Sequence, residues 1–161
     1  MSFVVSGCSQ QYPPGMPKLY PATITVIQDG QPLVDAQVVI INDDPAVSWS
    51  AGGNTDKNGR LKLRTLGQYD GAPLGKYKVG VEKMEYPDID LPLNPPYGNE
   101  KAMKEYQQLV KDYEDNTFIL VDRKYSLDNT ALSIEITPGN LHATVDVSPA
   151  IRKKAPPVPK G

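Results

Sequence analysis

Apolar and polar side chains alternate with a period of two along several short segments of the chain. Successive side chains of a strand point to opposite faces, so each segment is predicted to be a β-strand with one face in a core. The segments cover residues 22–28, 36–41, 60–64, 76–82, 132–136 and 141–147. The positions expected to point inward are Ala22, Ile24, Val26, Leu61, Leu63, Tyr77, Val79, Val81, Leu132, Ile134, Ile136, Leu141, Ala143, Val145 and Val147. Residues 36–41 are apolar on both faces, which predicts a central strand.

Turn-forming residues separate these segments. Asp29 and Gly30 predict a tight hairpin turn, because glycine tolerates the positive φ angle that such a turn requires. Similar breaks occur at residues 42–45, 55–59 and 138–140. Short strands at this spacing predict a mainly β fold, an antiparallel β-sandwich that spans residues 22–148.

The pattern changes in an insertion at residues 85–117. A proline-rich loop from Tyr86 to Gly98 precedes Asn99, which is a favourable residue to cap a helix from Glu100 to Asp115. The helix has an apolar stripe of Ala102, Met103, Tyr106, Leu109, Val110 and Tyr113. We expect this stripe to lie on the sheet of the sandwich. The alternative is that the helix recognises another protein.

Composition excludes several classes of protein. The chain has 161 residues, a formal net charge of −2 and no dense basic segment, which argues against nucleic acid as a partner. No apolar run approaches the roughly 18 residues that a membrane-spanning helix needs. One cysteine and one histidine exclude an internal disulfide and the common zinc sites. No cofactor and no metal are expected.

The single cysteine lies in a context typical of bacterial lipoproteins. Val5, Ser6 and Gly7 precede Cys8, and small residues before a cysteine mark the site where a lipoprotein signal peptide is processed and acylated. Only the four residues Met1 to Val4 precede this motif, which is shorter than a complete signal peptide. Residues 1–8 are therefore interpreted as the remnant of a signal peptide, with Cys8 as the lipid attachment site. The alternative is a free cysteine in a disordered tail. Ser9 resembles the sorting residue that favours the outer membrane.

The ends of the chain lack apolar periodicity. Residues 9–21 are polar and proline-rich, which is typical of a flexible tether between an anchor and a domain. Residues 149–161 are basic and proline-rich, and we expect them to be disordered.

Three segments of the chain resemble known motifs. Residues 30–38 (GQPLVDAQV), 55–61 (TDKNGRL) and 70–79 (DGAPLGKYKV) are similar to carboxypeptidase regulatory-like, transthyretin-like domains, and the third segment is typical of the small planctomycete-type lipoproteins of this class. Residues 124–125 and 132–140 resemble the closing stretch of those lipoproteins. The resemblance implies a prealbumin-like sandwich that is lipid-anchored or secreted, with no agreed activity.

The sequence gives only weak signals for a metal site or a catalytic site. Asp56 to Gly59 resembles part of a calcium loop, but the residues that follow supply no acidic ligand, so a turn is the better interpretation. His142 falls on the outer face of its strand and has no second histidine to work with, which argues against the hydrolase of the transthyretin-like class. Asp88 and Asp90 lie in the exposed loop. We therefore expect no catalytic site, and the protein is predicted not to be an enzyme.

Three aromatic residues are candidates for ligand binding. Trp49 precedes the Asp56 turn, and Tyr86 and Tyr97 lie in the proline-rich loop. Exposed aromatic rings present an apolar face that stacks on sugars. The alternative is that Trp49 caps one end of the core.

Together these patterns predict a non-catalytic, lipid-anchored β-sandwich at the bacterial outer membrane or cell surface, facing the periplasm or the exterior. Its role is expected to be structural or in protein interaction. A carbohydrate-binding module is the alternative. The expected partners are the membrane, through Cys8, and an envelope protein or polysaccharide, and a homo-oligomer is left open.

Overall fold

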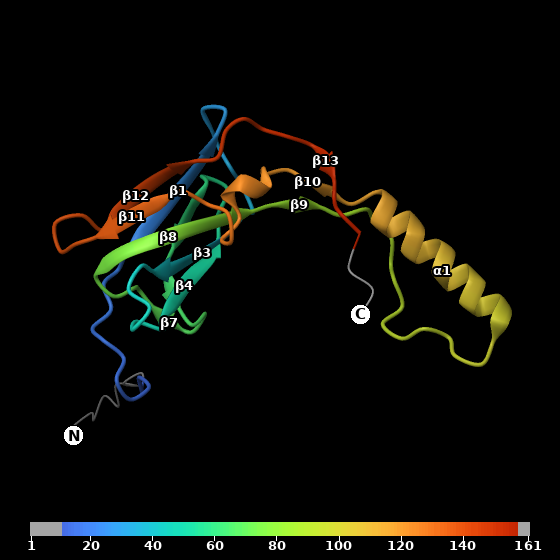
Figure 1. Cartoon of the computed structure of the whole chain (residues 1–161), viewed down its shortest axis with the longest axis horizontal. Helices are drawn as coiled ribbons and strands as arrows, with labels where there is room; N and C mark the ends of the chain where they lie inside the picture. The colour runs from blue at the N-terminus through green and yellow to red at the C-terminus, as the bar shows by residue number, and fades with distance from the viewer. Residues whose placement is uncertain (1–10, 158–161) are drawn as a thin grey trace, which may run out of the picture.

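Two sheets pack face to face in the computed structural model, which describes residues 11–157 (Figure 1). The smaller sheet contains β12 (His142–Asp146), β1 (Thr23–Gln28), β2 (Gln31–Pro32) and β5 (Arg60–Lys62). The larger sheet runs in the order β11 (Ser133–Ile136), β8 (Gly75–Glu82), β3 (Gln37–Asn42), β4 (Ser50–Asn54), β6 (Arg64–Thr65) and β7 (Tyr69–Asp70). The prediction of a mainly β fold is confirmed.

The alternating apolar residues fill the space between the sheets. Ile24 and Val26 of β1 and Tyr77 and Val79 of β8 are completely buried, as their inward phase predicts. The hydroxyl group of Tyr77 donates a hydrogen bond of 2.7 Å to the carbonyl oxygen of Pro73. The core therefore contains this phenol without leaving its polar atom unpaired, and burial raises the pKa of Tyr77.

One strand pair differs from the predicted antiparallel arrangement. β1 pairs with β12 in parallel, with Thr23 opposite His142 and Val26 opposite Val145. The two strands lie far apart in the sequence, so no hairpin between them dictates their relative direction. The smaller sheet is therefore mixed, because β1 pairs antiparallel with β2 and β5.

The chain crosses from one sheet to the other at Leu63. β5 pairs with β1 of the smaller sheet, and β6 pairs with β4 of the larger one. Leu63 lies buried between them, and its backbone amide donates to Ala22 while its carbonyl accepts from Gly71.

The helix begins and ends where the sequence predicts. α1 (Glu100–Asp115) is capped by Asn99, whose side-chain oxygen accepts a hydrogen bond of 3.0 Å from the amide of Ala102. The expected docking on the sheet is wrong, however. α1 projects away from the sandwich beyond the end of β8 (Figure 1), and none of its residues is buried.

A third, small sheet explains this position. β9 (Met84–Glu85) continues the chain after β8, and β10 (Phe118–Ile119) follows the helix. The two strands pair antiparallel, and β13 (Lys153–Lys154) pairs with the other edge of β10. This three-stranded sheet, which we call the arm root, leads residues 86–117 outward. We call residues 86–117 the helical arm.

Both ends of the described chain contact folded parts. The prediction of a disordered tail is wrong at β13, because the free edge of β10 offers hydrogen bonds to the tail, and Ala155 donates one of 2.9 Å to Thr117. In the tether, Tyr20 forms a bridge with Ala72, and the ring of Tyr12 lies 5.4 Å from that of Tyr69. A short 3-10 helix, η1 (Arg123–Tyr125), connects the arm root back to the sandwich.

Across residues 11–157, none of the helical structure combines the length and the apolar character that crossing a bilayer requires.

Candidate functional site

The arm root is held by charged residues of the tail. Arg152 donates two hydrogen bonds to Oε1 of Glu85, at 2.7 and 3.1 Å, and its guanidinium group lies 3.6 Å from the ring centre of Phe118. Lys154 donates a hydrogen bond of 2.5 Å to Asp115 at the end of α1. This hydrogen bond and the charge of the ammonium group lower the pKa of Asp115. The basic tail therefore neutralises acidic groups at the base of the arm.

The proline-rich loop runs back along the helix. Tyr86, at the start of the loop, stacks on Tyr113 near the end of α1 with ring centres 6.1 Å apart. Asn99, at the end of the loop, caps the start of α1. The loop therefore spans the helix from end to end, and Ile89 and Leu91 on the loop are half-buried, as are Tyr106 and Val110 on the helix.

The arm nevertheless leaves large apolar side chains in solvent. Leu93 is 98% exposed, Tyr97 is 82% exposed, and Leu109 is 38% exposed. Tyr86 is 58% exposed as well. Scattered apolar residues are normal on protein surfaces, but four of them on one projecting element form a candidate contact surface. The arm is also acidic, with seven acidic and three basic residues and so a net charge of −4.

A second candidate surface lies on the outer face of the larger sheet. We call it the open sheet face and define it by Gln37, Val39 and Ile41 of β3 and Ser50 and Gly52 of β4. Val39 lies opposite Gly52 on one neighbouring strand and opposite Gly80 on the other. Because Gly52 and Gly80 lack side chains, the side chain of Val39 stands above them as a ridge, with a hollow on each side.

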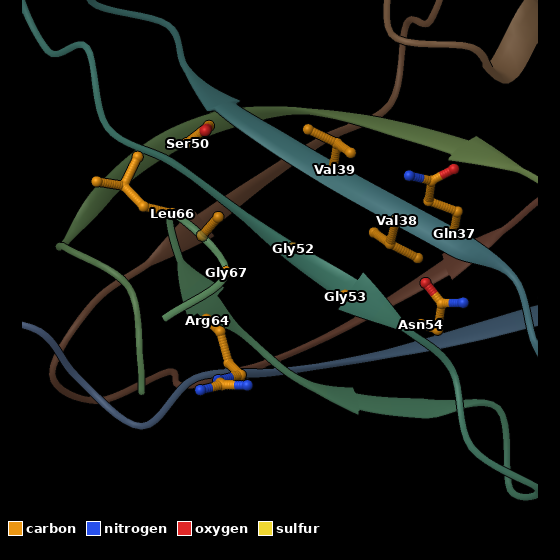
Figure 2. A pocket seen from close by; sticks show the side chains of 11 residues that line it. Gln37, Val38, Val39, Ser50, Gly52, Gly53, Asn54, Arg64, Leu66 and Gly67 are labelled. Carbon is orange, nitrogen blue, oxygen red and sulfur yellow. The ribbon is translucent and has the colours of Figure 1, made fainter. Parts of the chain in front are cut away.

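The larger hollow is shown in Figure 2. It has a volume of about 330 Å³, and the bare backbone of β4 at Gly52 and Gly53 forms its floor, with Val39 on one side and Leu66 at one end. A Cβ atom on Gly52 would lie 2.2 Å from the carbonyl oxygen of Val38. No larger residue fits at this position, so the hollow is a fixed property of the strand.

Two smaller hollows continue the open sheet face. One, of about 200 Å³, lies between Val39 and Leu127, whose backbone passes directly over Gly80. The other, of about 210 Å³, reaches Met84 and Tyr86 at the base of the arm. All three hollows share Gln37, so they form one continuous, partly apolar surface.

The structure does not bring the three candidate aromatic residues together. Trp49 is half-buried and precedes Ser50, which pairs with Ile41 near the start of β8. Tyr86 follows β9, beyond the opposite end of β8, and Tyr97 lies near the far end of the helical arm. They therefore form no common platform. Cys8, the proposed lipid attachment site, lies outside the described residues.

The Asp56 segment is a turn, as predicted. One carboxylate oxygen of Asp56 accepts hydrogen bonds from the amides of Asn58 and Arg60, at 2.8 and 3.0 Å, and these bonds lower the pKa of Asp56. Within residues 11–157, no three His, Cys, Asp or Glu side chains gather in a way that would hold a metal ion. His142 lies on the outer face of the smaller sheet, 2.6 Å from the hydroxyl oxygen of Thr23.

Sequence reasoning missed the open sheet face, although a signal for it was present. The apolar residues on both faces of 36–41 predicted a central strand, which β3 is. In the structure Val39 is only half-buried and Ile41 is 37% exposed. The outward apolar residues, together with the adjacent glycines of β4, indicate an uncovered surface rather than a second core.

Comparison of the chain with models of protein families, with curated proteins and with solved structures finds no match.

Proposed function

We propose that this protein is a non-catalytic interaction module of the bacterial cell envelope. Lipid on Cys8 holds it at the outer membrane or cell surface, and the sandwich carries the helical arm as its contact element. The single observation that supports this role is the placement of α1, which is a helix without one buried residue, held clear of the core by its own small sheet.

The positions of the tether and of the arm support the proposal. Tyr12 and Tyr20 contact the region of β7, at one edge of the larger sheet. The arm leaves from the end of β8, and Figure 1 shows residues 11–20 on the side of the sandwich away from α1. A lipid-anchored chain of this shape presents its arm away from the membrane.

We also propose that the sandwich is of the transthyretin-like class. Seven strands of three residues or more build the two sheets of the described chain. The motif-like segments occupy the Asp29–Gly30 turn, the Asp56 turn and the start of β8, which are structural positions. This likeness agrees with a scaffold role and supplies no catalytic group.

Site-specific crosslinking tests the proposed function. A photo-crosslinking residue replaces Tyr97 in the protein, expressed with a complete signal peptide in bacterial cells. We expect a covalent adduct to a second macromolecule of the envelope. The matched control places the same group at Asp70, whose side chain is 87% exposed on β7, and should give no such adduct. A chain that crosslinks equally from both positions, or from neither, contradicts the proposal.

The lipid anchor has its own test. The intact protein should sediment with membranes, and Cys8→Ala should remain in the soluble fraction because it lacks the acyl group. Soluble behaviour of both forms would reject the lipid anchor without bearing on the arm.

A further inference from the structure

Two surfaces of this chain each lack a partner. The open sheet face exposes Ile41 and half of Val39, with backbone hollows on both sides of the ridge. The helical arm exposes Leu93, Tyr97 and Leu109. Leu127 covers the sheet at Gly80, and the loop covers part of the helix stripe, so the parts that stay open are Val39, Ile41 and Gly52 on the sheet and Leu109 on the helix. A helix and a sheet are layers that proteins commonly stack against each other.

The arm cannot cover the sheet of its own chain. β10 is paired on both edges, by β9 and by β13, and the Arg152–Glu85 and Lys154–Asp115 ion pairs close the arm root on two sides. The arm root therefore places α1 outward, beyond the end of β8 (Figure 1). Covering its own sheet would require breaking these contacts, whereas the arm of another copy meets no such obstacle.

The dimensions of the two surfaces agree. The 16 residues of α1 extend about 24 Å, and the six residues of β3 extend about 20 Å. A helix about 10 Å wide would cover about 240 Å² on each surface. One such contact is too small for a stable interface, but two reciprocal contacts involve four surfaces and about 1,000 Å². This estimate is close to the value of about 1,200 Å² at which stable interfaces begin.

The charges beside the apolar residues are complementary. Glu105 and Asp112 lie one turn from Leu109 on either side, at positions i−4 and i+3. On the open sheet face, Lys78 lies directly opposite Ile41 on the neighbouring strand. None of the ion pairs among residues 11–157 involves Lys78 or Glu105. An acidic helix edge around Leu109 therefore fits a sheet face whose exposed isoleucine is beside a lysine.

We propose that two copies of this chain exchange their helical arms. Leu109 of each copy packs on Val39 and Ile41 of the other, and Glu105 faces Lys78. The reciprocal arrangement is a closed two-fold dimer, because the same pair of surfaces is used twice. This inference rests on the proposed function and names its partner as a second copy.

Reversing the charges at Lys78 and Glu105 tests whether the arms are exchanged. The full chain carrying Cys8→Ala is studied by sedimentation velocity over a range of concentrations, and we expect a monomer–dimer equilibrium. Lys78→Glu and Glu105→Lys should each weaken dimerisation by about tenfold, because each places like charges together in both contacts. The double variant restores the opposite charges and should restore most of the affinity. A chain that stays monomeric, or two single variants whose combination does not recover, overturns the arm exchange.

Disulfide trapping gives a second measurement that does not depend on affinity. One chain carries Leu109→Cys, another carries Val39→Cys, and both carry Cys8→Ala. Mixing them under oxidising conditions should yield a covalent heterodimer. The control replaces Val39→Cys by Thr25→Cys, which lies on the outer face of the other sheet and should not be trapped. Equal trapping of both pairs contradicts the proposed contact.

The outcomes separate this inference from the proposed function. Crosslinks from position 97 to a different envelope protein, with no trapped dimer, would overturn the arm exchange and support the interaction module. Absence of any crosslink and of any dimer would overturn both.

Discussion

Successive residues of β3 point alternately toward the core and toward the outer face of the larger sheet. Val38 and Ile40 point inward and are completely buried, whereas Val39 and Ile41 point outward beside glycines and a lysine. The inward residues could be predicted from the sequence because strict alternation places them on one face. The environment of the outward residues could not be predicted, because an apolar side chain looks the same in the sequence whether it is buried or exposed.

Truncation of one inward residue and of one arm residue should separate stability from association. Ile40→Ala should lower the free energy of unfolding by about 2–5 kcal/mol, because it removes packed methylene groups and leaves a cavity. Leu109→Ala should change it by less than about 1 kcal/mol, since Leu109 is not among the described residues that pack against the core. Urea unfolding of the monomer checks both values. A loss of several kcal/mol in Leu109→Ala would mean that the arm is docked on its own sandwich.

Two glycines in turns make a matched pair for a second prediction. Gly30 and Gly59 both have positive φ angles, of 75° and 71°. A Cβ atom at Gly30 meets nothing within 4 Å, whereas at Gly59 it would lie 2.7 Å from the carbonyl oxygen of Val26. Gly30→Ala should therefore cost about 1 kcal/mol from backbone strain alone. Gly59→Ala should cost clearly more, and equal melting temperatures of the two variants would contradict this explanation.

At the scale of elements, the bounds of α1 and its position relative to the sandwich depend on different features of the chain. The bounds of α1 follow from local features, the Asn99 cap and the apolar stripe, and the sequence predicts them correctly. Its projection depends on the pairing of β10 with β13, two strands of two residues each that are distant in the sequence. Such short strands carry no periodicity, and Lys153 and Lys154 read as a solvated tail. The pattern of apolar and polar residues therefore could not predict the arm root.

The ion pair between Lys154 and Asp115 predicts how the arm root responds to pH. The pKa of Asp115 is lowered by the hydrogen bond from Lys154, so the contact stabilises the folded state above the ordinary aspartate value of about 4. This contribution is lost as the pH falls through the lowered pKa of the folded state. An NMR titration should find Asp115 ionising below its usual range, and Lys154→Gln should return it toward that range. An unchanged titration in Lys154→Gln would show that Lys154 does not pair with Asp115 in solution.

At the scale of the whole molecule, the sandwich and the helical arm are separate parts of the structure. The core lies between the two sheets and includes no residue of the helical arm. The arm instead carries exposed apolar residues and a net charge of −4. We therefore expect the sandwich to fold without the arm, and we propose that the arm serves association.

The most direct test replaces the arm by a turn. Glu85 and Phe118 are directly opposite each other in an antiparallel pair, so residues 86–117 can be replaced by the two-residue turn Asn-Gly, which suits such a hairpin. The measurement is the free energy of unfolding in urea, at a concentration where the full chain is monomeric. We predict that it stays within about 1 kcal/mol of the value for the full chain. A loss of several kcal/mol would show that the arm is part of the folded core and would contradict the account.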